Sequence, residues 1–81
     1  MEEDILIEKL ASLIHDEWCD WSKEIAKTEN ISQKRLKRWI RLWIPYSELK
    51  EETKEVDRGW ARKVVEIFKE NHDVWKNKQK R

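Results

Sequence analysis

The side chains of this 81-residue sequence that could do chemistry begin with His15 and Cys19, which stand four residues apart. On a helix the two share one face, where an imidazole and a thiolate could hold a metal ion. A zinc site needs three or four protein ligands, and no second His or Cys pair offers that spacing. Nucleophilic catalysis has no better support, because no serine has a diagnostic context and the single glycine excludes a Gly-rich phosphate loop. We therefore expect no catalytic residue, no metal and no cofactor, in a protein that is not an enzyme.

Tryptophan is the residue type that most favours a binding role. Six tryptophans occur in the chain, and each can remove roughly 150–250 Å² of surface from water. This is more ring area than a core of this size needs, so we expect at least one or two rings to be partly exposed. A tryptophan face beside an arginine can hold a planar ring that carries phosphates. The alternative is that the rings only fill a small core, since tryptophan is rarely fully buried in any protein.

Charge is unevenly distributed along the chain, although the net charge is only +1. Residues 1–30 hold nine acids and three bases, whereas residues 31–45 hold five bases and no acid. The bases include Lys34, Arg38 and Arg41, which we expect to contact phosphate, an acidic partner or the acidic first segment of the chain itself. Nucleic acid is the less favoured partner, because domains that bind phosphate backbones usually have a pI above about 9 and this chain is nearly neutral.

The apolar pattern predicts three helices. A stripe from Ile7 to Ile25 recurs every three or four residues and predicts one long amphipathic helix. Ser32 is a suitable cap for a second helix that runs to about residue 40. Pro45 favours extended chain near residues 42–46, because proline biases the preceding residue away from helix. Helical spacing resumes near Ser47 to Glu51 and continues to Phe68.

These patterns predict a small, mainly α fold of three to four helices, with one domain over residues 4–73 and a basic tail at 74–81. Gly59 is a weak point in the third helix and could serve close packing of another backbone or ring. Cys19 is the only cysteine, which fits a reducing compartment. The acidic start and the absence of any apolar run beyond three residues favour a cytoplasmic protein with no membrane contact.

Two stretches together resemble the RyR domain, the repeat named after ryanodine receptors and also found as short bacterial, archaeal and phage proteins. Leu13 to Trp18 reads LIHDEW, and Ile44 to Arg58 reads IPYSELKEETKEVDR. The family pattern is I-H-x-x-W, then L-V-P-Y-x-x-L, then K-x-x-D-R before a helix. The resemblance covers roughly residues 10–70. The family's G-W-x-Y-G segment is missing, because residues 28–41 are shorter, glycine-free and basic.

The resemblance implies a mainly helical fold and a non-enzymatic module that stacks an adenine-type nucleotide, or a nucleotide-derived signal, on Trp18. It implies that His15, Tyr46 and Arg58 accompany Trp18, with Arg58 as a phosphate-pairing fork. Structural roles are the alternative for all three: a satisfied core histidine, a tyrosine that pins the extended segment, and an Asp57–Arg58 ion pair or cap. The alternative function is a protein-interaction module or small homo-oligomer that uses the basic segment 34–41 and exposed tryptophans.

Overall fold

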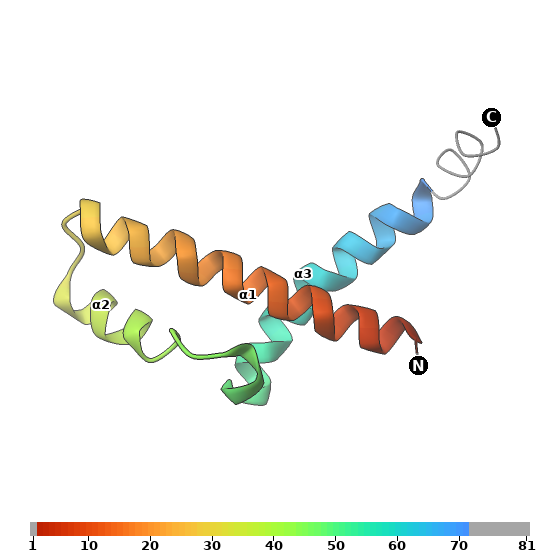
Figure 1. The fold of residues 1–81 in the computed structure, drawn as a ribbon, viewed down its shortest axis with the longest axis horizontal. Coiled ribbons are helices and arrows are strands. Elements are labelled where there is room, and N and C mark those ends of the chain that lie inside the picture. Colours follow the sequence, from red (N-terminus) through yellow and green to blue (C-terminus); the bar gives the residue numbers. More distant parts are fainter. Residues whose placement is uncertain (1, 72–81) are drawn as a thin grey trace.

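The computed structural model describes residues 2–71, which form three α-helices (Figure 1). Helix α1 spans Glu2–Thr28, α2 spans Gln33–Ile40 and α3 spans Glu51–Glu70, with a short 3-10 helix, η1, at Tyr46–Glu48. No strand occurs in this part of the chain. The prediction of a mainly helical fold with three to four helices is therefore confirmed. The predicted domain end at residue 73 and the basic tail 74–81 lie outside the described residues.

The chain between α2 and η1 leaves the helical conformation, as predicted. The backbone turns after α2, where the Leu42 amide donates to the Trp39 carbonyl at 2.8 Å. Pro45 is extended, with φ of −56° and ψ of 144°. The extended stretch is shorter than the predicted 42–46 at both ends, because Leu42 still belongs to the turn after α2 and Tyr46 already belongs to η1. This short connection carries the chain back beneath the middle of α1 (Figure 1).

Local side chains account for the ends of the helices. The Ser32 hydroxyl oxygen accepts a hydrogen bond from the Arg35 amide at 3.1 Å, so Ser32 caps α2 as predicted. Three acids open α1 and two open α3, where they interact favourably with the positive end of the helix dipole. Asn71 follows the last turn of α3, and its side-chain amide donates to the Ile67 carbonyl at 2.9 Å. None of the helices within residues 2–71 has an apolar stretch long enough to cross a membrane.

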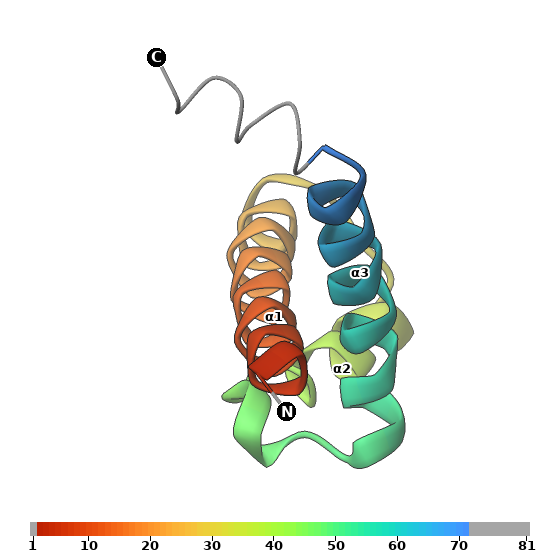
Figure 2. The ribbon, with the colours of Figure 1, turned by 90° about the vertical axis from the view of Figure 1, so that its right-hand side faces the viewer.

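The buried core lies where α1 crosses α3, and it is small. The two helices run side by side along this contact (Figure 2). Two of the core side chains are fully buried alanines, one on each helix, which let the helix backbones approach closely. Residues from η1 close one end of the core. Its six apolar members are Ile7, Ala11, Tyr46, Leu49, Ala61 and Val65.

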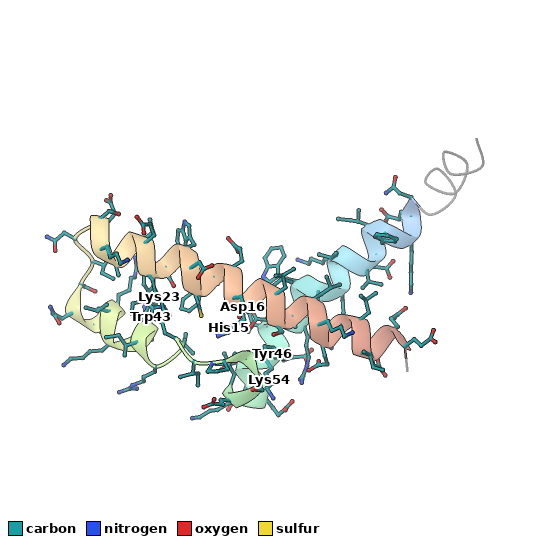
Figure 3. The ribbon with its side chains drawn as sticks, viewed as in Figure 1. His15, Asp16, Lys23, Trp43, Tyr46 and Lys54 are labelled. Carbon is teal, nitrogen blue, oxygen red and sulfur yellow. The ribbon has the colours of Figure 1, made fainter. Side chains whose placement is uncertain are left out.

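A layer of tryptophans joins α2 to the second half of α1. The Trp39 ring meets Trp18 edge-on, with centroids 5.9 Å apart, and lies 6.2 Å from Trp21. The Trp43 indole N–H donates to the hydroxyl of Ser22, which is fully buried, at 2.9 Å. Lys23 lies above the Trp43 ring at 5.9 Å (Figure 3). None of the five tryptophans within residues 2–71 is fully buried, which confirms the expectation that some rings are exposed.

Gly59 does not serve close packing, so that expectation was wrong. A Cβ atom built on Gly59 would meet no atom within 4 Å, and the backbone there is ordinary α-helix. The residue lies in α3 on a flank that no other described segment covers closely. Gly59 is therefore an open position in the helix rather than a contact point.

Candidate functional site

His15 is the buried polar centre of the fold, where three parts of the chain meet. It lies on the inner face of α1 and is only 4% exposed. Its Nε2 atom lies 2.8 Å from the Ile44 carbonyl oxygen, which can only accept, so Nε2 carries the proton. Its Nδ1 atom lies 3.7 Å from a carboxylate oxygen of Asp57 on α3. His15 thus joins the extended connection to α1 through a hydrogen bond and places its ring beside Asp57 of α3.

The Asp57 carboxyl group stands in an unfavourable place for a charge. It is half-buried beside His15 and receives no hydrogen bond from a described residue. Burial raises the pKa of Asp57, and the imidazole of His15 only partly opposes that effect.

Cys19, His15 and Asp57 stand in the order of a thiol, imidazole and carboxylate triad, but the arrangement does not activate the thiol. The Cys19 Sγ atom lies 3.4 Å from His15 Nε2, whose proton is already directed at Ile44. Burial raises the pKa of the Cys19 thiol, and three nearby aspartates act in the same direction, although Lys23 opposes them. A thiol with a raised pKa is a weak nucleophile at neutral pH. No group of three His, Cys, Asp or Glu side chains with metal-binding geometry occurs within residues 2–71.

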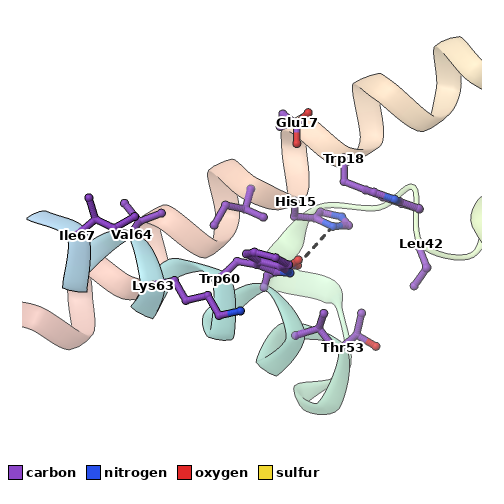
Figure 4. Close-up of a pocket in the computed structure, with 12 residues that line it drawn as sticks. His15, Glu17, Trp18, Leu42, Thr53, Trp60, Lys63, Val64 and Ile67 are labelled. Carbon is purple, nitrogen blue, oxygen red and sulfur yellow. Dashed lines mark ion pairs between the residues drawn. The ribbon is translucent and has the colours of Figure 1, made fainter.

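An apolar groove opens beside His15, between α1 and α3, and we call it the α1–α3 groove (Figure 4). Its volume is about 790 Å³. Trp18 forms part of its wall from α1 and stacks on the His15 ring, with centroids 6.1 Å apart and planes inclined by 22°. The groove is lined by Ile14, His15, Glu17, Trp18, Leu42, Thr53, Val56, Asp57, Trp60, Lys63, Val64 and Ile67.

The α3 wall of the groove is a row of exposed apolar side chains, which we call the α3 apolar face: Val56, Trp60, Val64 and Ile67. Lys63 lies over the Trp60 ring, with its Nζ atom 4.2 Å from the centroid. Sequence reasoning placed Val56, Trp60 and Val64 in the helical pattern without separating them from the buried residues. The width of the apolar pattern was the signal that could have revealed an exposed row. Apolar residues occupy two neighbouring flanks of α3, and only one flank can face the small core.

Tyr46 and Arg58 do not line the groove, although the Tyr46 ring lies beside His15, with centroids 6.5 Å apart. Both side chains donate hydrogen bonds to Glu8 on α1. The Tyr46 hydroxyl donates to Glu8 Oε1 at 3.0 Å, and Arg58 Nε donates to Glu8 Oε2 at 2.6 Å. Arg58 also donates to Glu51 at 2.8 Å, so its guanidinium fork is occupied by carboxylates of the chain. These contacts raise the pKa of Arg58 and lower that of Glu8. The Asp57–Arg58 ion pair does not form, because Asp57 faces His15 instead.

The basic residues Lys34, Arg38 and Arg41 lie on and just after α2, apart from the groove. All three are exposed. None makes an ion pair with a carboxylate within residues 2–71. They therefore form a separate basic surface, which we call the α2 basic face, together with Arg35 and Lys37.

Comparison with known proteins gives no match to a family model, to a curated protein or to a solved structure. The RyR-domain resemblance therefore stays a prediction. The geometry of the groove and of the surfaces around it is the basis for a functional proposal.

Proposed function

We propose that this chain is a non-enzymatic protein-interaction module whose binding surface is the α1–α3 groove. The observation that carries the proposal is the α3 apolar face, whose four large side chains remain 41–63% exposed at helical spacing. Contiguous exposed apolar surface of this kind marks a site of interaction in soluble proteins. An amphipathic helix that presents residues at positions i, i+3 or i+4 and i+7 matches a two-helix groove, and this is a common mode of recognition.

The charges in the groove support an apolar partner over an anionic one. Two carboxylates, Glu17 and Asp57, stand in the lining against one base, Lys63. Because like charges across a desolvated interface are costly, a polyphosphate meets an unfavourable field here. Arg58, which the family resemblance assigned to phosphate, is occupied by Glu8 and Glu51.

The proposal is tested by placing a photo-crosslinking amino acid at position 56, on the α3 apolar face, in the native cells. Position 5 provides the matched control, since Ile5 is 58% exposed, Val56 is 63% exposed, and Ile5 lines neither hollow of this surface. We expect protein adducts from position 56 and none from position 5. Adducts of equal yield at both positions, or at neither, would overturn the proposal.

A second candidate function is the binding of a planar aromatic ligand, such as an adenine-type base, against Trp18. It is favoured by the stack of Trp18 on the buried His15 and by the groove volume of about 790 Å³, within the roughly 300–1,000 Å³ typical of ligand sites. In this form the ring enters the groove and Lys63 is the basic group nearest to any phosphate.

Thermal unfolding distinguishes this second candidate. A ligand that binds the folded state raises the unfolding midpoint, so adenine nucleotides and cyclic dinucleotides are the probes. We expect the wild type to shift and Trp18→Ala, shown by circular dichroism to be folded, not to shift. No shift with any of these probes in the wild type would remove the nucleotide form of the proposal.

A further inference from the structure

A second apolar hollow also lies between α1 and α3. Its volume is about 410 Å³, and it is bordered by the start of α1 and the end of α3, where Leu6, Val65 and Phe68 are among the residues that line it. On α1, Leu6 and Glu17 are eleven residues apart and so lie on one face of the helix. On α3, the apolar residues that line the two hollows run from Val56 to Phe68, which is roughly 18 Å at 1.5 Å per residue.

The two hollows expose as many large apolar side chains as the core has apolar members. The core holds six apolar side chains, two of them alanine, whereas eleven large apolar side chains are exposed within residues 2–71, and six of these eleven line the two hollows. A chain of this length buries only about 60% of its unfolded surface even when compact, so small domains often complete their cores by association. A stable interface removes about 800 Å² from each partner. The exposed valines, isoleucine and tryptophan of the α3 apolar face supply apolar surface to such an interface.

The charged residues around the groove indicate which charge its occupant should carry. Acids stand along the α1 edge of the hollows, with Glu17 at one and Glu2 and Glu3 at the other, and one lysine of α3 lines each hollow. Lys69 pairs with Glu3 at 2.8 Å, so Glu2 and Glu17 are the α1 acids of the lining without an ion pair within residues 2–71. Helix α1 as a whole holds eight acids and three bases, a sum of −5. The matching occupant is therefore apolar along one face and basic beside it.

The same chain supplies both properties. The α3 apolar face provides the apolar row, and the α2 basic face provides five bases that have no carboxylate partner within residues 2–71. The net charge of +1 leaves little long-range repulsion between copies. In a two-fold dimer the same surface patch of both copies forms the interface, so that patch has to be complementary to itself.

We propose that a second copy of this chain covers the α1–α3 groove, in a two-fold dimer in which the α3 apolar face of each copy packs into the groove of the other. This inference rests on the proposed function, because it names the partner. The α2 basic face of each copy attracts the acidic α1 of the other, and this attraction increases the rate at which the two copies meet.

Sedimentation equilibrium of the full chain, from low micromolar to millimolar concentration, tests the dimer. Ile67→Glu places a charge on the α3 apolar face, and Ile5→Glu is its matched control, with the same substitution at a similarly exposed isoleucine (61% and 58%). We expect the wild type and Ile5→Glu to dimerise alike, and Ile67→Glu to raise the dissociation constant at least ~30-fold. Equal helicity of the three proteins by circular dichroism shows that the loss is not unfolding.

Three outcomes would overturn the inference: a wild type that stays monomeric throughout, equal weakening by both substitutions, or photo-adducts from position 56 that join two parts of a single chain. Failure of the dimer is distinguishable from failure of the proposed function. Adducts from position 56 to a different protein would leave the interaction module in place and exclude the second copy. Adducts with twice the mass of the chain would support both the interaction module and the dimer.

Discussion

Replacement of Gly59 by alanine tests the described packing of α3 directly. A methyl group built at Gly59 meets no atom within 4 Å, and the residue has ordinary helical backbone angles. The substitution therefore removes the entropic cost of a mid-helix glycine without creating a clash. That cost is about 0.5–1 kcal/mol, so we predict a rise of ~2–8 °C in the unfolding midpoint of a chain this small.

The matched comparison is Ala61→Gly, two residues further along the same helix. Ala61 is fully buried against α1, so this change adds the glycine cost and also removes a buried methyl group. We expect it to destabilise the fold by about 2 kcal/mol. Thermal and urea unfolding monitored by circular dichroism, at low protein concentration, measure both effects. A lower midpoint for Gly59→Ala would refute the reasoning, because it would mean that another group packs against Gly59.

Three further predictions concern the charged and reactive groups. The hydrogen bonds from Arg58 hold the pKa of Glu8 below its ordinary value, so the ionised Glu8 carboxylate stabilises the fold above pH ~4.3 and this stabilisation is lost as the pH falls through the lowered pKa. Acid should therefore reduce the free energy of unfolding more in the wild type than in Glu8→Gln, and parallel pH profiles of the two proteins in urea unfolding would contradict this. Burial raises the pKa of Cys19, so iodoacetamide should label it at least ~10-fold faster in urea than in the folded protein; equal rates, followed by mass spectrometry, would show an open thiol. Arg38→Glu combined with Arg41→Glu should weaken the dimer several-fold at low salt and little at high salt, and sedimentation with no salt dependence in either protein would exclude charge steering.

The helices could be predicted from the sequence because their signals are local. The three- and four-residue spacing from Ile7 to Ile25 reports an amphipathic helix wherever that helix packs. The hydroxyl of Ser32 caps its own chain three residues on, and Pro45 restricts its immediate neighbour. Each of these effects acts within about one turn of backbone, so neither the partner helices nor the core had to be known.

The candidate site was only half predictable for the same reason. His15 and Trp18 belong together because they lie one turn apart on α1. Tyr46 and Arg58 were grouped with them through the family resemblance, and the Tyr46 ring does lie beside His15. Arg58 instead binds Glu8, which is 50 residues away in sequence and also accepts the hydrogen bond of the Tyr46 hydroxyl. No local pattern encodes a pairing of that separation, so Glu8 had no signal in the sequence.

Sequence by itself determined that the protein is helical and which three segments form its helices. Tertiary structure alone decided which flank of α3 is buried. Both flanks are apolar, and the choice between Ala61 with Val65 and Trp60 with Ile67 depends on which side chains let α1 approach. Small residues permit close helix contact, so the alanine flank became the core and the larger side chains were left facing the groove.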